Sequence, residues 1–308
     1  MANTVVNVKN LVKNYGDVKA VRGLSFSVEQ GETFGMLGPN GAGKTTTVEI
    51  IEGLRTADSG EVTVLGMDVS KVPARIKQRI GVQLQAPSLL PLVNVTELLS
   101  LFGSFYNRSL QVNDVLELLS LQESRKVLVK NLSGGQQQRL SVALALINDP
   151  DIAFLDEPTT GLDPQARHNL WSVIEKMRSQ GKTVFLTTHY MEEAEHLCDR
   201  VAVVDHGNII AEGSPRELIQ TYFKENAVEF DMDPPPPEPV MKGLPGVSSV
   251  RIAKNEATIY SCDMPGTMSE LLKYAEKTDT TSKLKHLRVR EATLEDVFLK
   301  LTGRTIRE

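Results

Sequence analysis

"ETFGMLGPNGAGKTTTVEIIEGL" (residues 32–54) joins a short apolar segment to a glycine-rich loop and then to a helix-forming segment. The loop matches the pattern Gly-x-x-x-x-Gly-Lys-Thr at Gly38, Gly43, Lys44 and Thr45. Because the loop lies between a strand and a helix, its backbone N–H groups and the helix dipole converge on one point and favour an anion there. We therefore expect an α/β fold with a phosphate site, in which Lys44 neutralises phosphate oxygens and the Thr45 hydroxyl completes a magnesium shell.

The composition is that of a globular protein with room for two domains. The chain has 308 residues, 41% of them hydrophobic, and 34 basic against 39 acidic residues. Without a basic excess, nucleic acid is not an expected partner. Cys198 and Cys262 show no disulfide or metal-site spacing, which fits a reducing cytosol. No apolar run approaches the ~18 residues that span a bilayer and no signal peptide is evident, so we expect a cytoplasmic chain.

Strands and helices are expected to alternate around the loop. Alternating polarity predicts strands in "TVVNVKNLVKNYG", "LSFSVEQGETFGMLG" and "GEVTVLGMDV". From Val95 to Leu128, apolar residues recur every three to four positions, which predicts an inserted helical subdomain with Thr96 and Asn113 as N-caps. "DIAFLDEP" and "KTVFLTTH" are typical of buried parallel strands. Their polar ends should meet at the carboxyl edge of the sheet, where open α/β sheets bind ligands.

A second unit is expected where this alternation weakens, near Thr221. "AVEFDMDPPPPEPV" begins with a strand, and the later segments "VSSVRIAKNEATIYSC", "TMSELLKYAEKT", "LKHLRVRE" and "LEDVFLKLTG" predict further strands and helices. Their succession indicates a small α+β domain, with a ferredoxin-like sandwich as one candidate. The predicted domains are residues 1–225, including a helical subdomain at about 86–140, and residues 226–308.

Three polar residues at strand ends are candidates for chemistry. Asp156 and Glu157 follow an apolar strand, where adjacent carboxylates repel each other unless a cation or a catalytic task keeps both. We expect Asp156 to face magnesium and Glu157 to act as the general base for an attacking water. His189 follows the next apolar strand, and its position favours a hydrogen bond to the γ-phosphate or to that water.

A second anion-binding device is predicted in "NLSGGQQQRL" (residues 131–140). A serine and two glycines stand directly before a helix-forming segment, which again prepares backbone N–H groups to hold an anion. A phosphate loop upstream would bind phosphate unaided. The presence of two such devices in one chain therefore needs an explanation.

Five motifs follow one another along the chain: the phosphate loop, "LSGGQ" (132–136), "FLDEP" (154–158), "GLD" (161–163) and His189. Together they resemble the nucleotide-binding subunit of ATP-binding-cassette (ABC) transporters. The resemblance covers residues 4–218 and implies a P-loop NTPase fold with a mixed-sheet core, an antiparallel β subdomain and the helical subdomain. It implies ATP and Mg²⁺ as cofactors. The residues it places on the nucleotide are Tyr15, Gly38, Pro39, Asn40, Gly41, Ala42, Gly43, Lys44, Thr45, Thr46, Ser133, Gly134, Gly135, Gln136 and Asp163.

The resemblance also assigns individual roles. Tyr15 is similar to the aromatic residue that stacks on adenine, and Gln85 to a switch-loop glutamine, with Gln83 two residues away as the alternative. Asp163 resembles a residue that contacts the opposite subunit. The implied catalytic residues are Lys44, Gln85, Glu157 and His189, and the implied magnesium ligands are Thr45, Gln85 and Asp156.

The family arrangement explains the two anion devices. Two subunits pack head to tail, so Ser133 and Gly135 of one would cap the γ-phosphate held by the loop of the other. "REATLEDVFLKLTGR" (290–304) resembles the tail of ATPase subunits from drug- and antibiotic-export systems. The implied function is a homodimeric ATPase that drives export of a drug, antibiotic, lipid or ion through a separately encoded permease, peripheral on the cytoplasmic face of the membrane. The alternatives are a soluble ABC-class ATPase that acts on nucleic acid or ribosomes, and a P-loop binding module without catalysis.

Overall fold

The computed structural model describes residues 3–84, 89–278 and 284–303. The chain divides into two compact units, Met1–Pro215 with Leu301–Glu308, and Arg216–Lys300. The boundary proposed from the sequence, between residues 225 and 226, differs from this division by helix α8 (Pro215–Tyr222). Among the described residues, no helix combines the length and the apolar composition needed to cross a bilayer.

A six-stranded sheet forms the centre of the first unit, in the order β10-β9-β3-β8-β7-β6. Its strands are parallel except β10, which runs antiparallel to β9. Every residue of β3, β7 and β8 is buried, which explains their nearly continuous apolar sequences. The strand bounds are β3 Thr33–Leu37, β6 Ile80–Gln83, β7 Ile152–Asp156, β8 Thr183–Thr188, β9 Arg200–Asp205 and β10 Asn208–Gly213.

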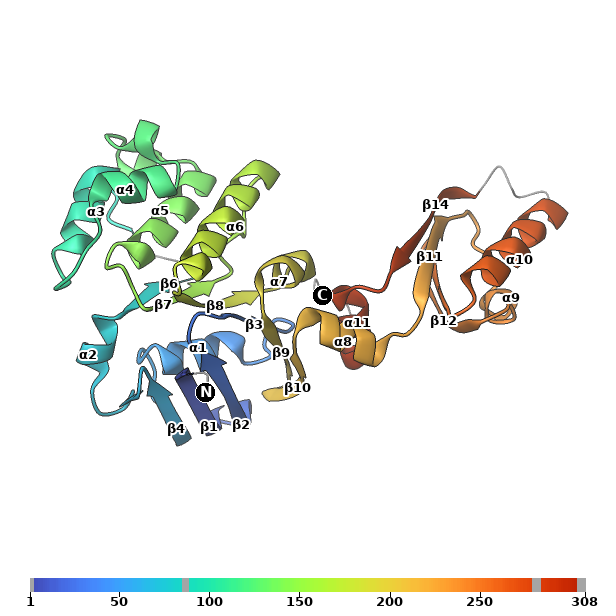
Figure 1. Cartoon of the computed structure of the whole chain (residues 1–308), viewed down its shortest axis with the longest axis horizontal. Coiled ribbons are helices and arrows are strands. Elements are labelled where there is room, and N and C mark those ends of the chain that lie inside the picture. Colours follow the sequence, from blue (N-terminus) through green and yellow to red (C-terminus); the bar gives the residue numbers. More distant parts are fainter. Residues whose placement is uncertain (1–2, 85–88, 279–283, 304–308) are drawn as a thin grey trace. The chain divides into compact units, whose positions relative to one another are not determined.

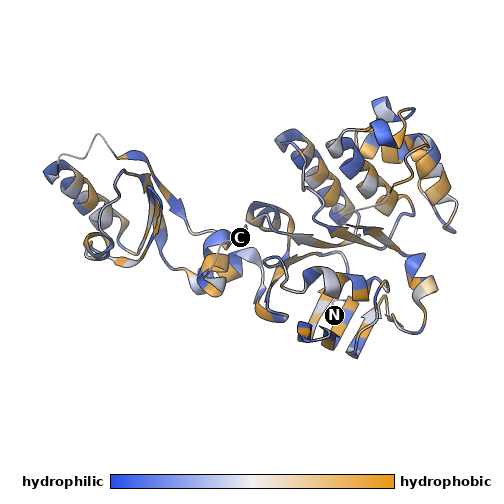
Figure 2. Ribbon diagram, turned by 180° about the vertical axis from the view of Figure 1, so that it is seen from behind, coloured by the Kyte–Doolittle hydropathy of each residue, from blue (hydrophilic) through white to orange (hydrophobic). Residues whose placement is uncertain are grey.

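An antiparallel sheet, β2-β1-β4-β5, packs on this centre. Figure 2 shows hydrophobic and hydrophilic residues alternating along its strands, as expected for a sheet with one buried face. The rings of Phe26 and Phe34 stack with centroids 5.4 Å apart, and Phe185 lies 5.4 Å from Phe34, so aromatic packing joins the two sheets. The bounds are β1 Thr4–Tyr15, β2 Val18–Glu29, β4 Ser59–Val64 and β5 Met67–Asp68.

Helices cover the other side of the six-stranded sheet, where Figure 1 shows α3 to α6 opposite the antiparallel sheet. The helix bounds in this unit are α1 Lys44–Ile51, α2 Pro73–Lys77, α3 Val95–Gly103, α4 Val112–Leu118, α5 Gly134–Leu146, α6 Pro164–Ser179 and α7 Met191–Leu197, with 3₁₀ turns at Gln122–Ser124 and Val129–Asn131.

The N-caps predicted for two of these helices are wrong. Thr96 lies inside α3, whose N-cap is Asn94, because Asn94 and Glu97 each accept a 2.9 Å hydrogen bond from the other's backbone N–H. The Thr96 hydroxyl instead donates to a carbonyl oxygen outside the helix. Asn113 likewise lies inside α4, which begins one residue earlier, after Gln111 as N-cap.

After α8, the second unit has the order β-α-β-β-α-β, followed by a last helix. Its strands form an antiparallel sheet in the order β12-β13-β11-β14. Numbered by appearance this order is 2-3-1-4, so the ferredoxin-like candidate is the one observed. Val228, Phe230 and Ile259 of the sheet pack with Met241 and Leu271 of the helices in one buried cluster. The bounds are β11 Asn226–Asp231, α9 Glu238–Lys242, β12 Val247–Ala253, β13 Glu256–Ser261, α10 Met264–Lys277, β14 Lys285–Glu291 and α11 Leu294–Thr302.

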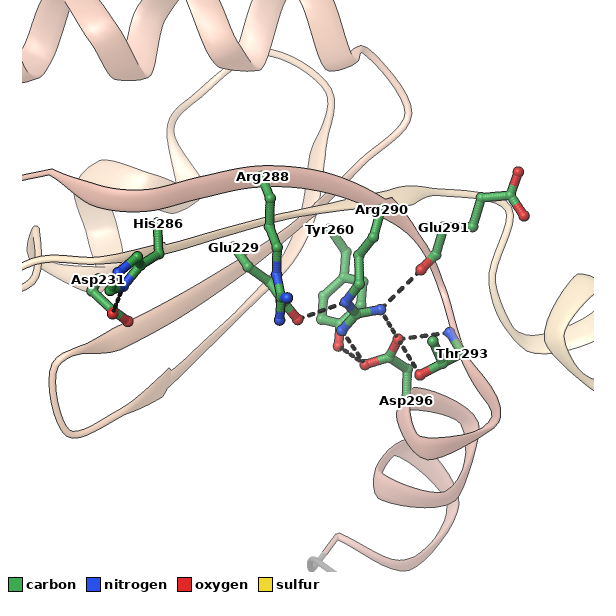
Figure 3. Close-up of polar contacts among 9 residues, drawn as sticks. All are labelled: Glu229, Asp231, Tyr260, His286, Arg288, Arg290, Glu291, Thr293 and Asp296. Atoms are coloured by element: carbon green, nitrogen blue, oxygen red, sulfur yellow. Dashed lines mark hydrogen bonds and ion pairs between the residues drawn. The ribbon is translucent and has the colours of Figure 1, made fainter. Parts of the chain in front are cut away.

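A buried polar network ties α11 to this sheet (Figure 3). Arg290 donates to Asp296 at 2.5 and 3.0 Å and to Glu229 at 2.6 Å. The hydroxyl of Tyr260 and the backbone N–H of Thr293 also donate to the Asp296 carboxylate, at 2.5 and 2.8 Å. Burial raises the pKa of Asp296, but these hydrogen bonds outweigh it and hold the pKa below its ordinary value. The carboxylate therefore stays charged and fixes the first turn of α11.

Candidate active site

The predicted phosphate loop connects β3 to α1, and close packing requires two of its glycines. A Cβ at Gly38 would lie 2.2 Å from the carbonyl oxygen of Val204, and one at Gly43 would lie 2.3 Å from that of Ala20. Gly43 also has a φ of 101°, in the left-handed region that favours glycine. The loop is therefore held between β9 and β2 in a shape that only glycine allows. Gly41 shares the left-handed backbone, and Asn40 and Gly41 are exposed.

Lys44 lies buried within this loop. Its Nζ donates hydrogen bonds to the carbonyl oxygens of Gly38 at 2.7 Å and Pro39 at 3.1 Å. Burial lowers the pKa of Lys44, and the negative charges of Glu157 and Asp156 partly oppose that effect. Both carboxylates thus act electrostatically on the loop lysine, as expected for groups at one edge of the sheet.

The threonines that follow Lys44 differ in exposure. Thr45 is exposed, Thr46 is half-buried, and Thr47 is buried with its hydroxyl donating to the Gly43 carbonyl oxygen. The Thr45 hydroxyl is thus accessible to a ligand, whereas Thr47 serves the helix itself.

Asp156 ends β7 and is buried, with the Thr187 hydroxyl of β8 donating to its Oδ1. Burial raises the pKa of Asp156, and the neighbouring Glu157 charge acts in the same direction. A cation at this carboxylate would offset both effects. Nε2 of Gln83 also donates to the Asp156 carbonyl oxygen, at 3.1 Å, so the end of β6 is tied to the end of β7.

Glu157 and His189 are brought into contact. Nδ1 of His189 lies 3.2 Å from Oε1 of Glu157, and the Thr160 hydroxyl donates to Oε2 at 3.3 Å. The hydrogen bond with His189 lowers the pKa of Glu157 more than burial raises it, so the carboxylate is ionised at neutral pH. Glu157 has a φ of 50°, an uncommon backbone conformation for a residue other than glycine, and strain of this kind concentrates at functional sites.

The signature residues 133–136 form a capping box at the start of α5. The Gln136 N–H donates to Ser133 Oγ at 3.2 Å, and the Ser133 N–H donates to Gln136 Oε1 at 2.8 Å. A Cβ at Gly134 would meet nothing within 4 Å, so the end of the helix is open to a ligand. Two residues further, Gln138 donates to the carbonyl oxygens of Glu157 and Pro158, so α5 is linked to the segment that follows β7.

The remaining predicted residues have the following places. Tyr15 ends β1, is 40% exposed, and has the cationic groups of Lys13 and Arg55 each 5.5 Å from its ring centroid. Asp163 is the N-cap of α6 and accepts a 2.8 Å hydrogen bond from a backbone N–H of its first turn. Gln85 lies outside the described residues.

Thr187 and Thr160 were not singled out from the sequence, although their hydroxyls donate hydrogen bonds to Asp156 and Glu157. Their only sequence signal is their place in "FLTTH" and "DEPTTG", next to residues that were recognised. A hydroxyl two residues before His189 has many structural uses, so sequence alone does not distinguish this one.

The magnesium prediction can be tested against the donor set. Among the described residues, no three His, Cys, Asp or Glu side chains are grouped to hold a metal ion by themselves. Mg²⁺ usually takes one or two protein oxygens and completes its shell with water and substrate phosphates. Buried Asp156 and the exposed Thr45 hydroxyl, close to the phosphate loop, fit this mode of binding.

Comparison with known proteins agrees with this geometry. The family profile described as ABC transporter matches residues 21–160. Nod factor export ATP-binding protein I of Ralstonia nicotianae is 40% identical over 311 residues, covering 99% of this chain and 95% of that protein. The protein of the same name from Rhizobium sp. (strain N33) is 39% identical over 99% of each chain.

Solved structures show the same fold. A dimeric ATP-binding cassette in a post-hydrolysis state, bound to ADP and Pi, has 28% identity and a TM-score of 0.64, and the match covers 68% of this chain and 98% of that one. An ATP-binding subunit of an ABC transporter has 26% identity and a TM-score of 0.66, covering 71% and 93%. This chain belongs to the ATP-binding proteins of ABC transporters. It is an ATPase, and the predicted fold class and the binding of ATP are confirmed.

Proposed function

We propose that this chain hydrolyses ATP to drive export through a separately encoded membrane permease. The relatives matched over nearly the whole chain are named as export ATP-binding proteins, which favours transport over an ATPase acting on nucleic acid or ribosomes. Nod factor, named in those relatives, is the first cargo to test. The wider prediction of drug, antibiotic, lipid or ion export also stays a proposal.

The contact of Glu157 with His189, at the sheet edge where Lys44 lies, carries the catalytic proposal. Lys44 and the backbone N–H groups of its loop bind the β- and γ-phosphates. Glu157 accepts a proton from the attacking water, while His189 holds its Oε1 in place. Keeping the Glu157 carboxylate ionised while it is only 9% exposed costs free energy. A role as catalytic base explains why the chain keeps it, whereas a domain that only binds nucleotide does not need such a carboxylate.

Mg²⁺ is proposed as the cofactor, with Asp156, directly or through water, and with Thr45 and Gln85 as its protein ligands. When bound, it neutralises charge on the transferred phosphoryl group. Tyr15 is proposed to stack on adenine. This would require the ring to exchange its cationic neighbours, Lys13 and Arg55, for the base.

A head-to-tail homodimer is proposed for the ATP-bound state. Ser133 caps its own helix, and the open space beside Gly134 leaves that helix end available to a phosphate from outside. The N-terminus of α5 therefore suits the nucleotide held by a partner's loop. Asp163 would face the partner near that phosphate.

The permease is proposed to dock on the helical subdomain. Four large apolar side chains of this segment are unusually exposed, namely Leu90 at 47%, Leu92 at 72%, Leu101 at 40% and Phe105 at 61%. Several large exposed apolar side chains within one subdomain favour this subdomain as the contact surface. Docking there would place the chain peripherally on the cytoplasmic face of the membrane.

The Glu157→Gln variant tests the catalytic proposal. The amide preserves the shape of the side chain but removes the base, so ATP binding should persist while hydrolysis slows by roughly 10²- to 10⁴-fold. ATP that is not hydrolysed should then hold the dimer closed, which size-exclusion chromatography with ATP and Mg²⁺ detects. Glu192→Gln, at an exposed glutamate of α7, is the matched control. A Glu157→Gln protein that hydrolyses ATP at the normal rate and stays monomeric would refute the assignment.

A further inference from the structure

Glu193 of α7 is a buried carboxyl group that the proposed reaction does not use. Its side chain is 0% exposed. Trp171 Nε1 of α6 donates a 3.2 Å hydrogen bond to its Oε1, and Oε2 is buried without a hydrogen bond of normal geometry. A buried polar atom left in this way costs stability, and an apolar side chain could fill the same space. The carboxyl therefore needs an explanation beyond packing.

The groups around Glu193 come from both segments that carry the catalytic pair. The hydroxyls of Thr188 and Thr159 are near enough to lower the pKa of Glu193, although burial outweighs them and raises it. Thr188 is the residue directly before His189, and Thr159 follows Glu157 by two positions. One carboxyl thus lies between the end of β8 and the loop after β7.

These two segments set the contact of Glu157 with His189. The Thr188 hydroxyl also accepts a 3.0 Å hydrogen bond from the N–H of Tyr190, on the far side of His189. The 3.2 Å separation of Nδ1 and Oε1 in the catalytic pair is therefore determined by how the two chain segments are held, and Glu193 is a group that both segments meet. Arg167 of α6 is the cation that acts on Glu193 from the side of α6.

We propose that Glu193 is a positioning residue, which holds the Thr159 and Thr188 segments so that Glu157 and His189 keep their reactive spacing. The proposal rests on the catalytic roles assigned above to Glu157 and His189. Small misplacements of catalytic groups cost far more in rate than in substrate affinity. The effect of Glu193 should therefore show in kcat and not in nucleotide binding.

Glu193→Ala should lower kcat by about 10-fold or more while KM and the affinity for ATP change by less than about 2-fold. Glu193→Gln keeps the size of the side chain and an acceptor for Trp171, so it should recover part of that loss. Glu192→Gln, one residue away and exposed, is the control. The fraction of folded protein is measured for each variant, and rates are expressed per folded molecule. An unchanged kcat per folded molecule would mean that Glu193 is only structural.

A double-mutant cycle separates this proposal from the catalytic one. In the Glu157→Gln background the base is gone, so Glu193→Ala or Glu193→Gln should change the residual single-turnover rate by less than about 2-fold. A loss as large as in the wild-type background would overturn the positioning role, because Glu193 would then act independently of the base. If Glu157→Gln alone left hydrolysis normal, the catalytic proposal would fail first, and the cycle reports that outcome separately.

Discussion

Glu52 is another buried carboxyl of the ATPase unit, and the pH dependence of its contribution to stability can be predicted. It is the C-cap residue of α1, is only 2% exposed, and its Oε2 has no hydrogen-bond partner. Burial raises the pKa of Glu52 to about 8 from an ordinary 4.5, and the charges of Asp156 and Glu49 add to the effect. The group is therefore protonated in the folded chain at neutral pH but ionised in the unfolded chain.

The sign of the effect follows from linkage. Because the folded pKa lies above the unfolded pKa, the contribution of Glu52 to stability is complete below about pH 4.5 and is lost as the pH rises to about 8. When a group takes up one proton on folding, the unfolding free energy falls by roughly 1 kcal/mol for each unit by which the pH rises within that window. From pH 5 to pH 8 this amounts to about 3 kcal/mol.

Glu52→Gln removes this titration while keeping the size of the side chain. Relative to the wild-type chain, the unfolding free energy of the variant should therefore rise by about 3 kcal/mol between pH 5 and pH 8. Urea unfolding without nucleotide measures it, with the fluorescence of Trp171, the single tryptophan, as a probe of the ATPase unit in which it is buried. Glu123→Gln, at an exposed position, should leave the difference from wild type constant with pH.

A constant difference between Glu52→Gln and wild type over this pH range would refute the reasoning. It would show that Glu52 takes up no proton on folding. The carboxylate would then have to be stabilised by a contact other than those described here.

Three further predictions test packing, the second unit and the dimer. Gly81→Ala would place a Cβ 1.8 Å from a carbonyl oxygen of α5, so it should lower the unfolding free energy by more than about 2 kcal/mol in urea, whereas Gly103→Ala, with its nearest contact at 3.5 Å, should not. Asp296→Ala removes one of the two carboxylate partners of the half-buried Arg290 and the acceptor of the Tyr260 hydroxyl, so it should destabilise the second unit by about 2 kcal/mol, seen by limited proteolysis, with ATP binding unchanged. Lys44→Ala and Ser133→Arg should each abolish ATP occlusion in homodimers, and their mixture should recover some of it; tagged mixed dimers that occlude no more than either parent would exclude capping in trans.

The phosphate loop was predictable because backbone geometry demands its residues. Position 43 needs a positive φ and no Cβ where the loop meets β2, and only glycine satisfies both conditions. The first residues of helices were harder to predict from the sequence, since Asn94 and Thr96 are both good N-caps by residue type. The two reciprocal hydrogen bonds between Asn94 and Glu97 decide in favour of Asn94. They depend on the backbone conformation of the residues before the helix, which the sequence does not give.

Contacts that come from tertiary structure alone were not predictable. Glu193 stands in "HYMEEAEHL" beside two other glutamates, and nothing in that segment distinguishes it. It is buried because α7 turns that one position towards α6 and the end of β8, where Trp171 meets it. A helical period predicts which face is buried only when the residues on that face are apolar, so a buried carboxyl is missed by the pattern.

The charges at the sheet edge bear on the proposed cofactor. The negative charges of Glu157 and Asp156 both act on the buried cation Lys44, and burial raises the pKa of Asp156. A triphosphate entering this loop would bring further negative charge, and Lys44 already uses two of its three N–H donors on backbone carbonyl oxygens. Positive charge that arrives with the nucleotide would therefore strengthen its binding at this edge. We accordingly expect the nucleotide to bind together with a divalent cation, with Asp156 as the carboxylate that the ion stabilises.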